Sequence, residues 1–304
     1  MNFLYYLKHL SVLLTLLWSI VSSANFINYS ENNNFNWAES YLVPNEESIE
    51  KALPIFSQTK EGVYIGVGTE RSFVGAAVSN ATHLLLADFD QDILIYNRMM
   101  IELFKFAKNK DEFYQIRTNF TQLADLFSHF HDSPLSNESI YNFLKRYRGT
   151  KLFSKRNWFY VEDSLKRPET SFWQNEDLYQ KLHKMALENK IQVVDLDFSK
   201  ENQRLKLVNA IKEKNLTISM LDLSNAWQLG YIGRKTYSAL VDFLPISTDH
   251  SLYMATWLES GIFNPYHAFY LKRLIQESPF GEGQILGETA INFNRCAYVL
   301  KGHD

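Results

Sequence analysis

Short apolar runs alternate with helical patterns along most of this chain of 304 residues. The alternation is typical of βαβ units, in which parallel strands form a sheet and helices cover it. Apolar runs predict strands at residues 63–67, 83–87, 191–194, 216–221 and 251–255. The pattern therefore predicts an α/β fold with a mostly parallel sheet and helices on both of its faces.

Helical spacing of apolar residues follows the predicted strands. Residues 73–78 and 93–107 predict helices after the first two strands, and Ser199 is placed to cap a helix after the third. About a hundred residues separate the second and third strands, where one crossover helix would suffice. The surplus, residues 110–185, shows further helical patterns. We interpret it as a helical insertion over one face of a single domain, residues 51–304.

The C-terminal part of the chain predicts two further elements. Asn264 followed by Pro265 is typical of a helix start, and apolar residues up to Ile275 fall mostly on one stripe. Residues 285–291 and 296–300 flank a turn. They predict an antiparallel hairpin at the edge of the sheet.

The first 24 residues have the features of a signal peptide. Lys8 and His9 precede an apolar run at residues 10–21, and small residues follow at 22–24. The run is shorter than the roughly 20 residues of a membrane-spanning helix. We therefore predict export, with residues 25–50 as a flexible lead-in and no stable membrane insertion after cleavage. An uncleaved N-terminal anchor is the alternative interpretation.

The composition limits the classes of partner and site. The single cysteine, Cys296, excludes an intrachain disulfide and any multi-cysteine metal site. An exported chain without disulfides fits a bacterial periplasmic or secreted protein better than a eukaryotic extracellular one. Lys and Arg number 31 against 34 Asp and Glu, a formal charge of −3. We expect no nucleic-acid partner, because the chain has no overall positive field, and we assign no metal site.

Two glycines, Gly66 and Gly68, stand at the end of the first predicted strand and ahead of a helix. Glycine permits a tight turn and a close approach of the backbone to a ligand. Asp88 follows Gly68 by 20 residues, at the end of the next strand. A carboxylate there can accept hydrogen bonds from ribose hydroxyls. The spacing indicates a nucleoside site, and a structural glycine turn with a helix-capping aspartate is the alternative.

Four segments follow one another in a characteristic order, at residues 66–68, 84–94, 191–195 and 218–222. In order, spacing and residue type they resemble the signature segments of Rossmann-like methyltransferases that use S-adenosylmethionine. The chain looks most like bacterial proteins that keep Gly-Val-Gly-Thr in place of a three-glycine loop. The resemblance implies a Rossmann-like domain with S-adenosylmethionine as its cofactor and a transferase activity.

The resemblance also implies where the cofactor lies. Its amino acid part would lie against the glycine turn, residues 66–68, and against Thr69. Its ribose would be bound by Asp88, and its adenine edge would face Asp195 or Asp197.

The loop after the fourth predicted strand, residues 222–228, is polar and then aromatic. Ligands bind at this edge of open α/β sheets, and the resemblance places the methyl acceptor here. Asp222 can accept a proton or orient an acceptor hydroxyl, Asn225 can hydrogen-bond it, and His250 is a candidate general base. These three are the predicted catalytic residues. The alternative interpretation is a capped helix and a surface histidine.

Three functions stay open on the sequence alone. The first is methyl transfer from S-adenosylmethionine to an acceptor, small molecule or protein, that the sequence does not identify. The second is a non-catalytic exported protein of the same fold that binds a ligand or a protein. The third follows from Asp88 and Asp90, which resemble the D-x-D strand end of haloacid dehalogenase phosphohydrolases, enzymes that use magnesium.

Overall fold

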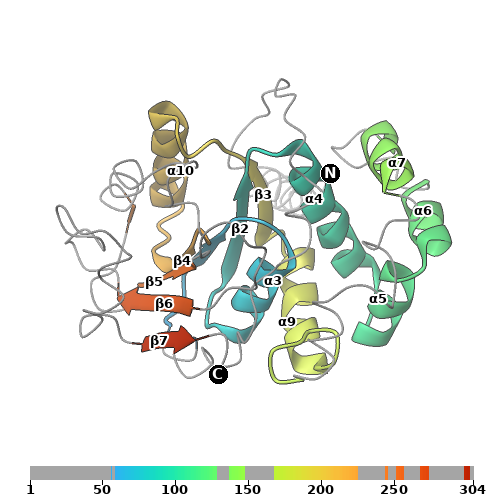
Figure 1. The fold of residues 1–304 in the computed structure, drawn as a ribbon, viewed down its shortest axis with the longest axis horizontal. Helices are drawn as coiled ribbons and strands as arrows, with labels where there is room; N and C mark the ends of the chain where they lie inside the picture. The colour runs from blue at the N-terminus through green and yellow to red at the C-terminus, as the bar shows by residue number, and fades with distance from the viewer. Residues whose placement is uncertain are drawn as a thin grey trace, which may run out of the picture.

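The computed structural model describes residues 56, 59–128, 137–147, 168–224, 244–245, 251–256, 268–273 and 298–301. Within these residues the strands form one seven-stranded sheet in the order β3-β2-β1-β4-β5-β6-β7 (Figure 1). The strands are β1 Val63–Gly66, β2 His83–Asp88, β3 Ile191–Asp195, β4 Ile218–Asp222, β5 Leu252–Thr256, β6 Ala268–Arg273 and β7 Tyr298–Lys301. Strands β3, β2, β1 and β4 are parallel, and β5 joins β4 in parallel. The predicted α/β fold with a mostly parallel sheet is confirmed.

Helices connect the parallel strands. They are α3 Glu70–Val78, α4 Gln91–Phe106, α5 Lys110–Arg117, α6 Phe120–Ser128, α7 Asn137–Arg146, α9 Glu176–Leu187 and α10 Glu201–Glu213. Helix α3 follows β1 and α4 follows β2, as the apolar spacing predicts. Helices α5, α6, α7 and α9 lie between β2 and β3, where the sequence predicts the helical insertion.

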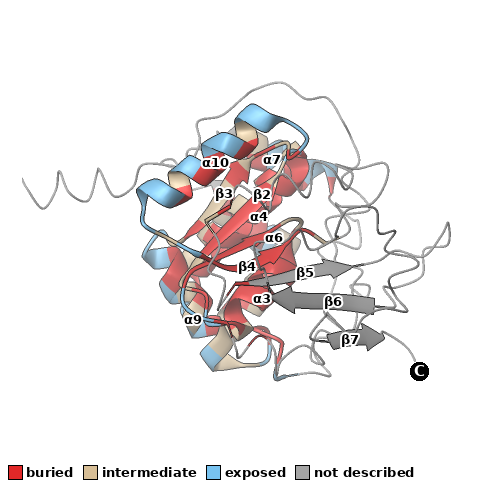
Figure 2. Cartoon of the chain, turned by 90° about the vertical axis from the view of Figure 1, so that its left-hand side faces the viewer, coloured by how far each residue is buried: buried red, intermediate tan, exposed pale blue. Residues whose placement is uncertain are grey.

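Different helices cover the two faces of the sheet. Tyr64 and Leu84 belong to the core that the sheet forms with α3, α4 and α9. Their neighbours Ile65 and Leu85 face the other way, because side chains alternate along a strand, and they are equally buried. Helix α10 lies on that second side (Figure 1) and buries Leu207, Val208 and Ile211. Figure 2 shows that β2 and β4 are largely buried between these layers, which is why they appear as apolar runs in the sequence.

The C-terminal strands differ from the prediction. The predicted helix from Asn264 to Ile275 is wrong, because residues 268–273 form β6, antiparallel to β5. Phe269 and Leu271 stand two residues apart in the sequence, which is the period of a strand and not of a helix. The predicted hairpin is not seen either: β7 pairs antiparallel with β6, and its other predicted arm, residues 285–291, lies outside the described residues.

Gly75 in α3 leaves room for the ring of Tyr64 in β1. A Cβ on Gly75 would lie 2.5 Å from Cζ of Tyr64, which is closer than two carbon atoms approach without a bond. The Tyr64 hydroxyl donates to Oδ2 of Asp222 at 2.7 Å. The glycine at position 75 thus permits a hydrogen bond that joins β1 to the end of β4.

The substitution Gly75→Ala is expected to lower the free energy of unfolding by about 1–3 kcal/mol, because the new methyl group displaces the Tyr64 ring. Chemical denaturation followed by circular dichroism measures it. In a Tyr64→Ala background the same substitution should be neutral or stabilise by up to about 1 kcal/mol, since alanine favours helix more than glycine. Equal losses in both backgrounds would contradict this explanation.

Among the helices that the structure describes, none combines the length and the apolar character that crossing a bilayer requires. The predicted signal peptide and lead-in, residues 1–24 and 25–50, lie outside the described residues.

Candidate functional site

Gly68 and Asp88 lie together at the carboxyl ends of β1 and β2. The Gly68 amide donates to Oδ2 of Asp88 at 3.3 Å. Gly68 has φ of 76°, in the left-handed region that favours glycine. No atom lies within 4 Å of the position that a Cβ would take on Gly68, so open space adjoins the turn. The structure therefore brings together the two features that the 20-residue spacing linked.

The Asp88 carboxylate is partly buried and receives several N–H donors. Its Oδ1 accepts from the amides of Phe89 at 2.8 Å and Asp90 at 3.0 Å. Burial raises the pKa of Asp88 to about 6, against the lowering effect of these hydrogen bonds. Three of about four lone-pair positions of the carboxylate are then in use, which leaves one for a ligand hydroxyl. The neighbouring Phe89 side chain is 45% exposed and offers an apolar surface beside it.

Gly66 and Thr69 shape the turn from within. A Cβ on Gly66 would lie 2.8 Å from Cβ of Ser72 in α3, so the close packing of α3 accounts for this glycine. Thr69 is the N-cap residue of α3 and is 2% exposed. Its carbonyl accepts from the Ser72 amide at 3.0 Å. The close packing at Gly66 and the hydrogen bond to Thr69 hold the backbone on both sides of Gly68 in place.

Asp195 lies directly beside Asp88, because the two residues are in register between β3 and β2. Its Oδ2 accepts from Nε2 of Gln91 at 3.2 Å. The Leu196 amide donates to the Asp88 carbonyl at 2.8 Å, which extends the pairing past the strand end. Burial raises the pKa of Asp195. Asp195 thus borders the same edge of the sheet as Asp88.

Asp197 is tied into the turn that leads to α10. Its Oδ1 accepts from the amide and the hydroxyl of Ser199 at 2.9 and 2.6 Å, and Lys200 forms an ion pair with it at 3.4 Å. The predicted capping role of Ser199 is wrong, because Lys200 is the N-cap residue of α10. Asp195 is therefore the better placed of the two candidates for contact with a ligand at Asp88.

Asp222, predicted to accept a proton or to orient an acceptor hydroxyl, is fully buried. Its Oδ1 accepts from Nη2 of Arg71 at 2.8 Å, an ion pair whose arginine is itself 3% exposed. The Ser224 amide donates to Oδ1 at 3.2 Å, and Tyr64 occupies Oδ2. These contacts make Asp222 an anchor between β4, β1 and α3. Its position does not support the predicted role in proton transfer.

The other two predicted catalytic residues, Asn225 and His250, lie outside the described residues, as does the rest of the loop after Ser224. Asp90, the second acid of the D-x-D pattern, is 7% exposed and caps α4 by accepting from the Asp92 amide at 2.9 Å. Among the residues that the structure describes, no three His, Cys, Asp or Glu side chains are grouped as metal ligands.

A buried polar network that was not predicted from the sequence adjoins the turn. Glu70, the first residue of α3, accepts from the hydroxyl of Tyr96 and forms an ion pair with Arg117 at 3.5 Å. Arg117 also donates to the Tyr96 hydroxyl at 2.6 Å. Asn97, next to Tyr96 in α4, donates from Nδ2 to the Gly68 carbonyl at 2.8 Å. The available signal was Asn97 itself, a polar residue on the apolar stripe of a predicted helix.

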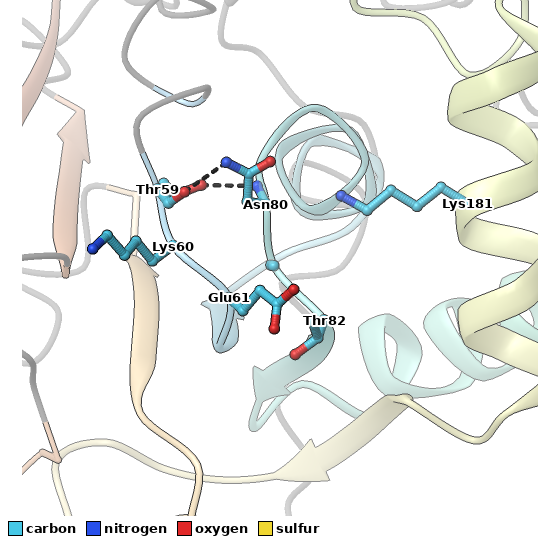
Figure 3. A pocket seen from close by; sticks show the side chains of 7 residues that line it. Thr59, Lys60, Glu61, Asn80, Thr82 and Lys181 are labelled. Carbon is cyan, nitrogen blue, oxygen red and sulfur yellow. Dashed lines mark hydrogen bonds between the residues drawn. The ribbon is translucent and has the colours of Figure 1, made fainter.

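A hollow lies at the opposite edge of the sheet, before β1 and β2 begin (Figure 3). Its volume is about 770 Å³, and it is lined by Thr59, Lys60, Glu61, Asn80, Ala81, Thr82 and Lys181. Lys181 Nζ donates to carbonyls at the end of α3, including that of Ala76 at 2.9 Å. Asn80 bonds to Thr59, as the dashed lines in Figure 3 show. Lys181, Asn80 and Thr59 are engaged in holding the fold, so we do not assign the candidate site to this hollow.

Two comparisons with known proteins bear on this site. A protein-family model described as "Domain of unknown function (DUF7790)" matches residues 41–270. A search among curated proteins found no match. The matched segment contains the glycine turn, Asp88, Asp195 and Asp222.

Proposed function

The chain belongs to the DUF7790 family, and we propose that it is a methyltransferase-like protein that binds S-adenosylmethionine at the turn formed by Gly68 and Asp88. The observation that carries the proposal is the contact between the Gly68 amide and the Asp88 carboxylate. It joins Gly68, whose φ lies in the left-handed region, to the Asp88 carboxylate at the carboxyl ends of two parallel strands. That edge is where open α/β sheets bind nucleosides.

The surroundings of Asp88 fit a nucleoside. One lone-pair position of its carboxylate is available for a ribose hydroxyl, and the exposed Phe89 ring offers a surface for a base. Asp195 stands beside Asp88 and can accept from an exocyclic amine. When bound, S-adenosylmethionine supplies an activated methyl group. The chain's part is to hold donor and acceptor in line, and the acceptor is a small molecule or a protein.

A second candidate is a non-catalytic exported protein of the same fold that binds a ligand or a protein. The observation in its favour is the burial of Asp222, which takes one predicted catalytic group out of reach of an acceptor. The proposed export through residues 1–24, to the periplasm or the medium, also favours it, since S-adenosylmethionine is a cytosolic cofactor. An exported methyltransferase would meet its cofactor only inside another cell.

Calorimetric titration with S-adenosylhomocysteine tests the proposal, with a dissociation constant in the micromolar range as the expected result. The variant Asp88→Ala is expected to weaken binding by about 10- to 100-fold, because a hydrogen bond to a charged acceptor is lost. Asp111→Ala is the matched control, since that side chain is 74% exposed on α5 and should leave the affinity unchanged.

Failure of wild-type protein to bind S-adenosylmethionine or S-adenosylhomocysteine at millimolar concentration would overturn the methyltransferase-like proposal. If binding is found, transfer of a labelled methyl group to components of a cell extract separates the enzyme from the binding protein.

A further inference from the structure

The pattern of Asp88 and Asp90 continues to a third acid, Asp92, at the same spacing of two residues. Asp88 Oδ1 accepts from the Asp90 amide at 3.0 Å, and Asp90 Oδ1 accepts from the Asp92 amide at 2.9 Å. A bond from an aspartate side chain to the amide two residues on is typical of an Asx turn. Two consecutive turns of this kind lead from the end of β2 into the first turn of α4. We call these three residues the aspartate ladder.

The third acid of the ladder is held by the inserted helices. Oδ2 of Asp92 accepts from Nη1 of Arg146, the last residue of α7, and from the hydroxyl of Tyr147 at 3.0 Å. Asp92 and Tyr147 are buried, whereas the Arg146 side chain is 52% exposed. Hydrogen bonds between charged groups are stronger than those between neutral ones. A series of hydrogen bonds therefore runs from Asp88, in the candidate site, to the end of α7.

The charge of Arg146 also acts on the second acid of the ladder. Burial raises the pKa of Asp90, and Arg146 acts to lower it. Burial likewise raises the pKa of Asp88, and the charge of Asp90 adds to that rise. Carboxylates that stand so close together disfavour each other's ionised form. Arg146 therefore compensates part of the repulsion within the ladder.

The orientation of the Asp88 carboxylate depends on the turn that the ladder forms. Its Oδ1 accepts from two amides of this turn, those of Phe89 and Asp90, so both lone-pair positions of Oδ1 are in use. The position that remains for a ligand hydroxyl is on Oδ2, beside the bond from the Gly68 amide. Hydrogen bonds weaken steeply as their angles become unfavourable. A change in the turn would therefore change how well Oδ2 accepts from a ligand.

We propose that Arg146 and Tyr147 are positioning residues for the nucleoside site. Through the aspartate ladder they hold the carboxylate of Asp88 in the orientation that accepts a sugar hydroxyl. This inference rests on the proposed function, because the hydroxyl belongs to the ligand bound at Asp88. It gives the end of the insertion a part in ligand binding that requires no contact with the ligand.

The first test measures the affinity of full-length variants for S-adenosylhomocysteine by calorimetry. Arg146→Gln is expected to weaken binding by about tenfold and Tyr147→Phe by about threefold, because each removes one hydrogen bond that holds Asp92. Arg146→Lys retains the positive charge and should bind more tightly than Arg146→Gln. Tyr147→Phe retains the ring that packs against Phe143, so it is the milder change to the fold. Lys145→Gln, at an exposed neighbour on α7, is the control and should leave the affinity unchanged.

The second test separates positioning from a general loosening of the fold. It compares S-adenosylhomocysteine with its analogue that lacks both ribose hydroxyls, and the ratio of the two affinities measures what the sugar hydroxyls contribute. We expect a ratio of about 10 to 100 in the wild type. In Arg146→Gln and Tyr147→Phe the ratio should fall, because only the hydroxyl contact depends on Asp88. A general loosening would weaken both ligands alike and leave the ratio unchanged.

The outcomes distinguish this inference from the proposed function. If the wild type binds S-adenosylhomocysteine and the ratio is the same in both variants as in the wild type, the positioning role is overturned and the proposed function stands. If the wild type binds neither ligand, the proposed function is overturned and the positioning role with it.

Discussion

Replacement of Arg71 by methionine is expected to lower the free energy of unfolding by about 3–5 kcal/mol. Arg71 and Asp222 form an ion pair at 2.8 Å in which the two side chains are 3% and 0% exposed. The variant leaves the Asp222 carboxylate buried without this arginine, while the Tyr64 hydroxyl and the Ser224 amide still donate to it. Removing one member of a buried pair leaves the charge of the other unpaired in the interior. The resulting loss in the free energy of unfolding greatly exceeds the contribution of a surface pair.

Chemical denaturation at pH 7 measures this loss. Lys110→Met is the control, because Lys110 pairs at 2.8 Å with an Asp111 side chain that is 74% exposed, and it should cost less than about 1 kcal/mol. The double variant Arg71→Met, Asp222→Leu should recover part of the loss, since no buried charge remains. If Arg71→Met costs no more than Lys110→Met, the buried pair does not hold β4 to α3 as described.

The free energy of unfolding is expected to fall by about 3 kcal/mol as the pH rises from about 4 to 8, through the single carboxyl group of Glu70. Burial raises the pKa of Glu70 from 4.5 to about 7, although Arg117 and Tyr96 act to lower it. Between these two values the folded protein binds a proton that the unfolded chain releases. The stabilisation is therefore complete below pH 4.5 and is lost as the pH rises through 7.

Denaturation curves at several pH values measure how the free energy of unfolding changes with pH in the wild type and in Glu70→Gln. The variant has no carboxyl group to ionise, so its stability should change by about 3 kcal/mol less over the same range. The comparison also removes the effect of Asp88, whose raised pKa acts in the same direction. Identical slopes in the two proteins would show that Glu70 ionises as an exposed acid does.

Much of the parallel sheet could be predicted because its strands are buried on both faces and read as continuous apolar runs. The link between Gly68 and Asp88 was also predictable, since a fixed spacing along the chain reflects one βα unit. The partner of Asp222 was not, because Arg71 lies 151 residues away in the sequence and no local pattern connects the two. The segment that contains Phe269 and Leu271 was predicted as a helix because short apolar stretches fit both a helix and a strand.

The pairing of Glu70 with Arg117 has a consequence for the inserted helices. Arg117 is the last residue of α5, within the segment that lies between β2 and β3. A shortened protein that omits this segment would leave Glu70 in the interior without its counter-ion and the Tyr96 hydroxyl without the donor that Arg117 supplies. The insertion thus helps to stabilise the part of the domain that carries the glycine turn, and a minimal version of this domain has to retain α5.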